Sequence, residues 1–370
     1  MAAIGPGPFA AMVLSDMGAE VLRLQRSGQS RLFGDSGVDV DGRGRLSLSV
    51  DLKNPQDVER VLGLIDHADG LIEGYRPGVM ERLGLGPDTV LTRNEQIVYG
   101  RMTGYGQEGP LAHVAGHDIN YISLTGALDA IGRQGERPLF PLNLVGDYGG
   151  GGMLLAFGMV CGLFEARESG QGQIVDAAMV DGASLLMSVF HGLRAGGVWA
   201  DQRGTNVLDS GAHFYEVYAT ADGGHIAVGA IEPQFHEALL RVLGLTDDPV
   251  FASRNDRAAW PAMRARLTEV FAARSRDEWA EAFDGQGACV SPVLSLTEAP
   301  EHPHHAARRT YLPGATGGHQ PAPAPRFSRT TAATPPQPAP LVGTDTDPVL
   351  TTAGLTPNDL QALRAKGAIA

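Results

Sequence analysis

Residues 46–73 read LSLSVDLKNPQDVERVLGLIDHADGLIE, and this stretch predicts a β-strand, an α-helix and a second β-strand in direct succession. Apolar alternation favours strands at residues 46–51 and 70–73. Between them, Asn54 is a typical helix N-cap and Pro55 a typical first helical residue, so we expect a helix through Ala68. Such strand–helix–strand units build parallel sheets that are covered by helices.

The same alternation extends on both sides of this unit, from residue 8 to residue 101. It predicts a helix at 9–17 and strands at 20–24 and 97–101. Three further helices are expected, at 117–130, 147–168 and 178–195. We therefore predict an α/β protein with a Rossmann-like large domain.

A second, smaller domain begins where the pattern changes, after residue 212. Residues 213–230 are typical of a β-hairpin around Asp222-Gly223-Gly224, and amphipathic helices follow at about 234–243, 257–273 and 276–285. A proline-rich arm comes next, and the last two helices, at 348–355 and 357–366, need the large domain as a packing surface. The predicted domains are a large domain at 1–195, a linker at 196–212, an inserted α+β domain at 213–300, an arm at 301–347 and a return to the large domain at 348–370.

Composition excludes several classes of protein. The 370 residues carry 29 basic and 42 acidic side chains, a net charge of −13, which disfavours binding to nucleic acid or to an anionic membrane. The two cysteines, Cys161 and Cys289, match no disulfide framework or metal-ligand spacing. The start lacks signal-peptide features, and the apolar stretch at 153–164 is shorter than the roughly 20 residues of a membrane span. We expect a soluble, cytoplasmic protein.

The string Gly5-Pro6-Gly7-Pro8-Phe9-Ala10 has the form of a dinucleotide-binding loop, but its chemistry is wrong for one. Such a loop follows a strand and directs free backbone N–H groups at pyrophosphate, whereas two of these residues are prolines without an N–H. A tight turn that starts a helix is the favoured interpretation.

Basic residues gather near the predicted strand ends of the first half, where open α/β sheets bind ligands. They are Arg23, Arg26, Lys53, Arg76 and Arg82. Solvated surface charge explains each residue singly, but the grouping fits a phosphate-rich ligand.

Two candidate proton-transfer residues lie at predicted helix starts, His117 in AGHDINY and Asp147 in VGDYGGGG. A lone histidine is usually structural, and an aspartate at a helix start is usually an N-cap. Four glycines after Asp147 are unfavourable in a helix, so a close approach of backbone to ligand is the better explanation for them. Free N–H groups there would also form an oxyanion site.

Long motifs carry a family resemblance from residue 5 to about residue 245. They are GPGPFAAMVLSDMGAEVLRLQR (5–26), SVDLKNP (49–55), IEGYRPGVMERLGLGP (72–87), GRMTGYGQEGP (100–110), AGHDINYISLTGAL (115–128), PLNLVGDYGGGGM (141–153), GQGQIVDAAMVDG (170–182) and VGAIEPQF (228–235). Together they resemble the α-methylacyl-CoA racemases, within the class III CoA-transferase (CaiB/BaiF-like) family. The resemblance implies an interlocked homodimer with active sites at the subunit interface, and an acyl-CoA thioester as substrate.

The resemblance also assigns roles to residues. It implies that His117 and Asp147 transfer protons and that Glu232 orients and charges the histidine. Residues that match positions near the CoA nucleotide are Arg26, Val50, Asp51, Leu52, Lys53, Arg76 and Arg82. Those that match the wall beside the thioester are Gly116, Asp118, Ile119, Asn120 and Tyr121, while the backbone of Tyr148 and Gly149 is expected to hold the enolate oxygen.

Three functions compete on these residues. Inversion of the carbon next to a thioester needs one base on each face of an enolate, which His117 and Asp147 supply without a cofactor or a metal. A CoA-transferase would instead use Asp147 as a nucleophile and would need no opposing base. A non-catalytic CoA-binding protein would need none of the three titratable residues His117, Asp147 and Glu232. The racemase is therefore the favoured function and the transferase the alternative.

Two departures from the family pattern stand out. Where relatives have an apolar strand before the GPGP turn, this chain has only Met1-Ala2-Ala3-Ile4, so the sheet is expected to lack a central strand unless the start is misassigned. In SGAHFYEVY (210–218), His213 replaces the usual proline, and this loop is expected to lie beside the acyl chain and to influence substrate preference.

Overall fold

A computed structural model of the chain describes residues 1, 4–26, 40–315, 317–332, 336–352 and 356–365. Its contacts divide the chain into two compact units. Unit 1 comprises Met1–Thr125, Leu142–Leu186 and His304–Ala370, and unit 2 comprises Gly126–Pro141 and Met187–Pro303.

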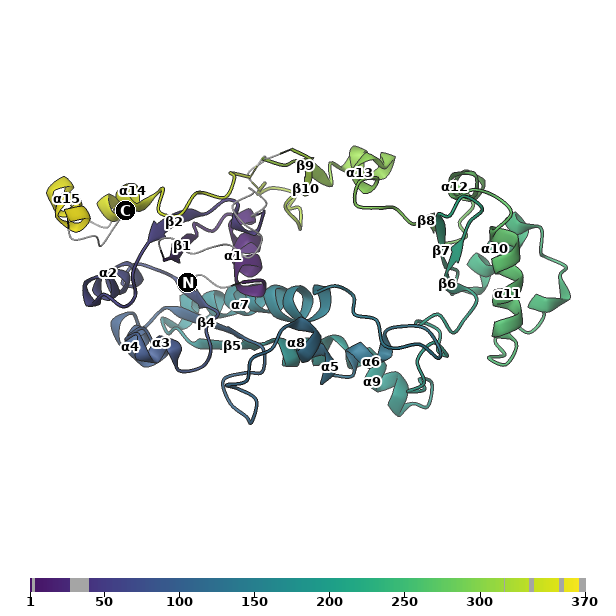
Figure 1. Cartoon of the computed structure of the whole chain (residues 1–370), viewed down its shortest axis with the longest axis horizontal. Helices are drawn as coiled ribbons and strands as arrows, with labels where there is room; N and C mark the ends of the chain where they lie inside the picture. Colours follow the sequence, from purple (N-terminus) through teal and green to yellow (C-terminus); the bar gives the residue numbers. More distant parts are fainter. Residues whose placement is uncertain (2–3, 27–39, 316, 333–335, 353–355, 366–370) are drawn as a thin grey trace. The chain divides into compact units, whose positions relative to one another are not determined.

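Unit 1 alternates helices and strands in the manner expected of an α/β domain (Figure 1). Its first half contains α1 (Pro6–Asp16), β1 (Leu22–Gln25), η1 (Val40–Gly42), β2 (Leu46–Ser49), α2 (Pro55–Ile65), β3 (Gly70–Glu73), α3 (Val79–Arg82), α4 (Pro87–Arg93), β4 (Val98–Thr103) and α5 (Asp118–Ser123). The rest contains η2 (Leu144–Met153), α7 (Leu154–Ser169), β5 (Ile174–Ala178), α8 (Met179–Leu186), α13 (Pro303–Arg308), β9 (Tyr311–Pro313), β10 (His319–Pro321), α14 (Thr346–Thr352) and α15 (Pro357–Ala365).

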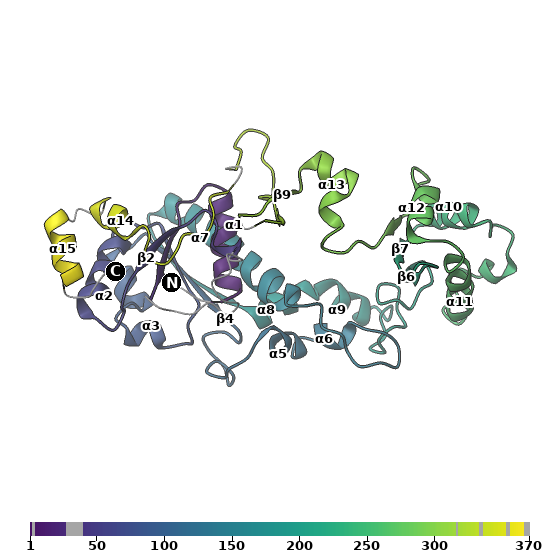
Figure 2. The ribbon, with the colours of Figure 1, turned by 45° about the horizontal axis from the view of Figure 1, so that its top comes forward.

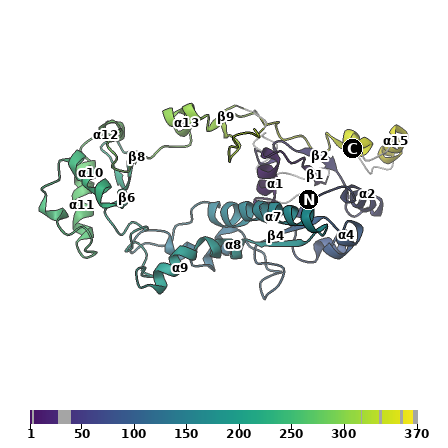
Figure 3. The same ribbon diagram turned by 180° about the vertical axis from the view of Figure 1, so that it is seen from behind.

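The sheets of unit 1 are parallel, apart from the small β9–β10 hairpin. β1 pairs with β2, and β3, β4 and β5 pair in that order, with Gly70 opposite Val98 and Tyr99 opposite Ile174. β4 is buried along its whole length, and α7 packs on β4 and β5 (Figure 3). The predicted α/β class with parallel strands is therefore confirmed.

The strand–helix–strand unit forms as its sequence predicts. Asn54 caps α2, because its side-chain oxygen accepts from the Gln56 amide at 3.0 Å, and Pro55 is the first helical residue. The helix ends at Ile65, three residues before the expected Ala68. Val61 and Ile65 are buried on the inner face of α2, so the amphipathic pattern of the helix sets its orientation.

The C-terminal segment packs against the same core. The Ser47 amide donates to Asp345 Oδ2 at 2.9 Å, and the Asp345 amide donates back to the Ser47 carbonyl at 3.1 Å. Leu350 of α14 and Leu360 of α15 belong to the core cluster that contains Leu48 of β2. The helix α14 lies beside β2 (Figure 2).

Three predicted helices have different bounds in the structure. The helix expected at 147–168 begins at Leu144 as a π-helix, η2, and continues as α7. The one expected at 117–130 is divided into α5 and α6 (Ala127–Ala130) by Gly126, whose φ of 81° is left-handed. The one expected at 178–195 follows an unpredicted strand, β5, and is divided into α8 and α9 (Ser188–Ala195). β5 escaped prediction because its pairing with β4 is a long-range contact.

At the N-terminus, residues 2–3 lie outside the described residues. The amino group of Met1 donates to the carbonyl of Ile72 in β3 at 2.7 Å. Among the described residues, no strand joins the β1–β2 pair to β3.

Unit 2 is built on an antiparallel sheet in the order β6–β7–β8. The three strands are β6 (Tyr215–Ala219), β7 (His225–Gly229) and β8 (Val290–Pro292). The helices of unit 2 are α6, α9, α10 (Pro233–Leu243), η3 (Pro249–Phe251), α11 (Trp260–Phe271), α12 (Arg276–Phe283) and η4 (Ala299–Glu301). The predicted hairpin is β6 and β7, and the three predicted amphipathic helices are α10, α11 and α12. Phe271 and Leu239 lie fully buried in the core between the sheet and these helices.

The predicted domain ranges differ from the observed units at residues 126–141 and 187–212, which belong to unit 2. The predicted arm at 301–347 is no separate segment either, because residues 301–303 belong to unit 2 and residues 304–347 to unit 1, where α13, β9 and β10 form. Ion pairs connect residues 126–141 to the rest of unit 2. Arg203 pairs with Asp129 at 2.9 Å, and Arg133 pairs with Glu216 at 3.2 Å. Such pairs join residues more than 70 positions apart, and no local pattern reveals them.

The continuous helix Leu144–Ser169 spans 26 residues and is long and apolar enough to cross a membrane by length and composition alone. This corrects the sequence estimate, which counted only residues 153–164. Core helices of soluble proteins meet the same criterion, and 44% of the most apolar window of this helix is buried inside the fold.

Candidate active site

His117 lies exposed at the N-cap of α5. Its backbone N–H donates to Asn120 Oδ1 at 3.1 Å, an arrangement that fixes the start of the helix. The imidazole is therefore presented from a rigid backbone position without being buried.

An aromatic pair supports the backbone just before His117. Tyr121 donates its hydroxyl hydrogen to the Gly116 carbonyl, and its ring meets Tyr105 edge-on at 4.9 Å. A Cβ at Gly116 would lie 2.8 Å from the Tyr121 ring, so only glycine allows this approach. Burial, and to a lesser degree the charge interaction with Tyr105, raises the pKa of Tyr121 to about 12. The hydroxyl therefore stays protonated and can donate.

Asp147 lies in the first part of the π-helix η2 and is half-buried. Its Oδ2 accepts from Asn143 Nδ2 at 3.0 Å, and a Cβ at Gly5 would lie 3.3 Å from the same oxygen. Gly5 has a φ of 74°, so the turn before α1 passes beside this carboxylate in a conformation that favours glycine. π-Helical segments often occur at functional sites.

Burial raises the pKa of Asp147, and the charge of Asp118 raises it further, while the Asn143 hydrogen bond and the charge of His117 act in the opposite direction. A carboxyl group with a raised pKa exchanges its proton more readily near neutral pH than an ordinary aspartate does. The structure thus brings His117 and Asp147 into one electrostatic environment within unit 1.

The glycines after Asp147 have a different explanation from the predicted approach of a ligand. A Cβ at Gly150 would lie 2.6 Å from the Ala183 nitrogen of α8, and a Cβ at Gly152 would lie 2.7 Å from the Phe9 ring of α1. Gly151 is similarly close to Met179. These glycines let η2 pack tightly between α1 and α8, so tertiary packing accounts for them.

One of the two expected oxyanion donors, the Tyr148 amide, is already bound within the protein. The Tyr148 amide donates to the Asn143 carbonyl at 3.3 Å, within the π-helix. The amides of Gly146 and Asp147 both donate to Asp118 Oδ2, at 2.7 and 2.8 Å. The prediction for Tyr148 is therefore wrong in this structure, because the helix begins earlier than expected and uses that amide; for the Gly149 backbone the role remains a prediction.

The predicted nucleotide residues follow strand ends of unit 1. Val50 comes directly after β2 and is buried, whereas Arg26, Lys53, Arg76 and Arg82 are exposed. Arg23 lies within β1 and not after it, because the strand extends to Gln25.

An ion-pair network centred on the buried side chains of Glu73 and Arg101 supports the loop that contains Arg76. Glu73 accepts from the Tyr75 amide at 2.7 Å and from Arg101 Nε at 3.1 Å, and Arg101 also pairs with Glu81 at 2.9 Å. Burial raises the pKa of Glu73 despite these donors. The network holds both ends of the loop, and sequence analysis missed it because the partners lie on different elements.

Other residues of the predicted thioester wall take different positions. Ile119 and Asn120 are exposed in the first turn of α5, whereas Asp118 is only 5% exposed. Asp51 and Leu52, two of the predicted nucleotide residues, form the turn before α2, where the Asp51 amide donates to Asp57 Oδ2 at 2.8 Å.

Glu232 belongs to unit 2, where it is the exposed N-cap residue of α10. It lies close enough to Arg254 for its charge to raise the pKa of that guanidinium, which burial lowers. Its carboxylate is therefore on the surface of unit 2.

His213 is fully buried in the core of unit 2, so its side chain does not line a ligand site there. Its Nε2 lies 2.8 Å from Nε2 of His236, and its ring packs against Phe214 and Phe251. The side chain of His213 thus has a buried partner 23 residues away, while the expectation that the loop 210–218 lies beside the acyl chain stays a prediction.

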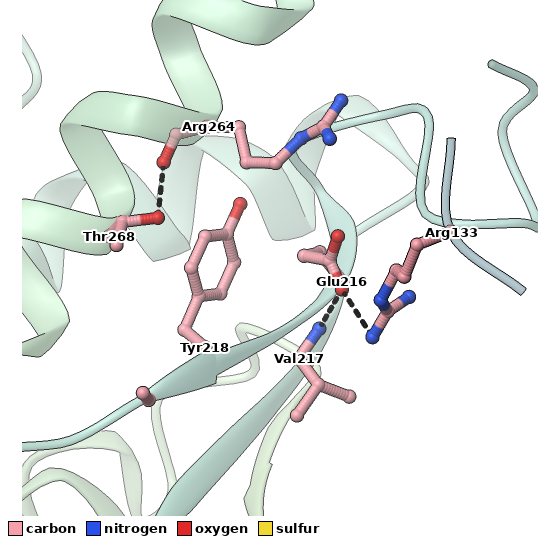
Figure 4. Close-up of a pocket in the computed structure, with 7 residues that line it drawn as sticks. Arg133, Glu216, Val217, Tyr218, Arg264 and Thr268 are labelled. Atoms are coloured by element: carbon pink, nitrogen blue, oxygen red, sulfur yellow. Dashed lines mark hydrogen bonds and ion pairs between the residues drawn. The ribbon is translucent and has the colours of Figure 1, made fainter. Parts of the chain in front are cut away.

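Unit 2 also contains a pocket of about 210 Å³ beside β6 and α11 (Figure 4). Its polar groups are mostly occupied by protein partners: Glu216 accepts from the Val217 amide and pairs with Arg133, and the Tyr218 hydroxyl donates to the His213 carbonyl. Thr268 donates to the Arg264 carbonyl at 2.8 Å. We assign no function to this pocket.

Comparisons with known proteins agree on one family. The model of CoA-transferase family III matches residues 1–346. The α-methylacyl-CoA racemase of Mus musculus is 44% identical, with 99% of this chain and 94% of that protein covered, and the human protein of the same name is 41% identical with the same coverage. A crystal structure of a CAIB/BAIF family protein from Brucella suis has the same fold, with a TM-score of 0.81 at 22% identity over 95% of this chain and 97% of that one.

Proposed function

The chain belongs to CoA-transferase family III, and we infer that it is a racemase that interconverts the (R) and (S) forms of 2-methylacyl-CoA thioesters. The observation that carries this conclusion is the identity of 41–44% to racemases over nearly the whole chain. The presence of His117 and Asp147 in one electrostatic environment of unit 1 supports it.

The proposed mechanism is a 1,1-proton transfer. One base removes the proton from the α-carbon, the electron pair of that C–H bond moves into the thioester to give an enolate, and the conjugate acid of the other base protonates the opposite face. Asp147 suits either role because burial and the charge of Asp118 raise its pKa. His117 suits the other because it is exposed at a rigid helix start.

We propose that the protein's own side chains suffice for this reaction, with no metal ion or cofactor and with CoA as part of the substrate. The exposed basic residues after β1, β2 and β3 are the proposed contacts for the CoA phosphates. They are Arg26, Lys53, Arg76 and Arg82.

We extend the proposal to a homodimer. Met153, Phe157, Val160 and Phe164 are all exposed at spacings of three and four residues, and Phe157 and Phe164 are 66% and 70% exposed. Such an apolar helix face favours burial against a second copy of the chain. In the dimer, Glu232 of the partner subunit is the proposed carboxylate that orients His117.

The alternative is a CoA-transferase in which Asp147 attacks the thioester and forms a mixed anhydride with the acyl group, releasing CoA as thiolate. Membership of a family named for that activity keeps this alternative open. It requires no role for His117.

The test is incubation of a single epimer of a 2-methylacyl-CoA in deuterated water. We expect deuterium at the α-carbon together with loss of the optical purity of the substrate. Adding a free carboxylic acid tests the alternative, since a transferase would form a new CoA thioester on that acid without deuterium in the original acyl chain.

A further inference from the structure

The carboxylate of Asp118 connects the two elements that carry the proposed bases. Asp118 is the first residue of α5 and follows His117 directly. Its Oδ2 accepts from the amides of Gly146 and Asp147, at 2.7 and 2.8 Å. This one buried oxygen therefore links the start of α5, where His117 lies, to the backbone of Asp147 in η2.

The residue types at positions 118 and 146 fit each other closely. A Cβ at Gly146 would lie 2.5 Å from Asp118 Oδ2 and 3.0 Å from its Cγ. Any side chain at position 146 would therefore displace the carboxylate. The first amides of a helix have no intrahelical acceptor, and a carboxylate that binds two of them is a strong cap.

The cap is nevertheless unfavourable in one respect. Asp118 is only 5% exposed, and its second oxygen, Oδ1, is buried without a hydrogen-bond partner among the described residues. A buried charged oxygen without a donor loses hydration that nothing replaces. Stability alone does not explain a carboxylate here, and its charge acts on Asp147, whose pKa it raises.

On the basis of the function proposed above, we propose that Asp118 is a positioning residue whose side-chain carboxylate holds His117 and Asp147 at the separation that two-sided proton transfer requires. The charge of the same carboxylate makes Asp147 easier to protonate. Asp118 thus acts through its two neighbours and needs no contact between its side chain and the substrate.

Three variants test this role. Asp118→Ala removes the cap and the charge, Gly146→Ala displaces the cap and leaves the charge, and Asp118→Asn keeps an acceptor oxygen and removes the charge. Asp248→Asn is the matched control, because Asp248 caps the short helix η3 of unit 2 through the Val250 amide at 3.0 Å. For each protein, kcat, KM and the pH profile of kcat/KM are measured with one epimer, and thermal unfolding verifies the fold.

We expect Asp118→Ala and Gly146→Ala to lower kcat about 10²-fold with little change in KM, since a displacement of about 1 Å between reacting groups has that effect. Asp118→Asn should lose less activity, and its acid limb should move to lower pH because the charge that raises the pKa of Asp147 is gone. A merely structural residue would not move that limb. The control should match the wild type in both measurements.

An Asn variant with the wild-type rate and acid limb would overturn the inference, even if the Ala variants fail to fold. A Gly146→Ala enzyme with normal kcat would also overturn it. Wild-type protein that exchanges no α-proton would overturn the proposed function, and this inference with it. Active wild type with unchanged variants would overturn the positioning role alone.

Discussion

His117 in unit 1 and the His213–His236 pair in unit 2 use the same side chain in opposite ways. His117 is exposed at a helix N-cap. His213 and His236 are 0% and 3% exposed, and burial lowers their pKa values to about 3 and about 4. A histidine that exchanges protons with a substrate must be reached by it, whereas a histidine in a core is held neutral by desolvation.

The electrostatic surroundings of the pair reinforce this contrast. Only one hydrogen can occupy the 2.8 Å gap between the two Nε2 atoms. Arg254 and Arg264 disfavour a further positive charge on His213, and Arg254 does the same for His236. Burial and charge therefore distinguish the proposed catalytic histidine from the buried pair, while residue type does not.

The largest expected effect is on the proposed bases. His117→Ala and Asp147→Asn should each lower the racemisation rate on the order of 10²–10⁴-fold, because each removes the proton donor or acceptor on one face of the enolate. Measurement of kcat with each epimer, together with CoA binding and thermal unfolding, tests this. Near wild-type turnover in either variant would contradict the two-base mechanism.

The buried His213–His236 pair should make the free energy of unfolding depend on pH in the acid range. Because the folded-state pKa values lie below the ordinary 6.5, the pair's stabilising contribution is complete above pH 6.5 and is lost as the pH falls from 6.5 towards 4. At pH 5 the loss should be about 2 kcal/mol per histidine. Urea unfolding of unit 2 within the full chain, followed by tryptophan fluorescence at pH 7 and pH 5, measures this loss of stability.

A double variant sharpens that measurement. His213→Phe with His236→Leu should unfold with a smaller difference between pH 7 and pH 5 than the wild type does, whatever its stability at pH 7. His117→Ala should retain the wild-type difference, since His117 is exposed. Equal acid sensitivity in the double variant and the wild type would assign the acid response to other groups.

Glu232 should have a smaller effect than His117. Glu232→Gln removes the negative charge proposed to stabilise the imidazolium, so the basic limb of the pH profile should move to lower pH, with a rate loss of about tenfold for each pKa unit. An unchanged profile would place Glu232 outside the site. In refolded mixtures, inactive His117→Ala and Glu232→Ala subunits should regain activity if each site takes one residue from each subunit.

The smallest expected effect is at Asn143. Its hydrogen bond lowers the pKa of Asp147, so Asn143→Ala should move the acid limb of the pH profile to higher pH and cost a few-fold in rate below neutral pH. Gln286→Ala, an exposed amide change in unit 2, is a suitable control. A limb that does not move would show that the Asn143 contact is absent in the working enzyme.

Local patterns were sufficient for much of the fold. The Asn54 cap, the amphipathic α2, α10, α11 and α12, and the β6–β7 hairpin follow from residues within a few positions of one another. The long motifs were likewise sufficient to identify the family, which the comparison with whole proteins confirms.

Other features depended on partners far apart in the chain. The strand β5, the π-helical start at Leu144 and the buried cap between Asp118 and Gly146 all involve contacts across dozens of residues. The glycines after Asp147 are the clearest example, because the same residues suit a ligand loop or a tight helix contact, and only their distances to Ala183 and Phe9 distinguish the two.

The sequence by itself thus determined the α/β class, the family and the identity of the proposed bases, because periodicity, caps and long motifs are local properties of the chain. The tertiary structure alone decided which histidines are buried, how the pKa of Asp147 is raised and which carboxylate links the two base-bearing helices. Burial and electrostatic interactions arise between residues that meet only after folding, so no local pattern contains them.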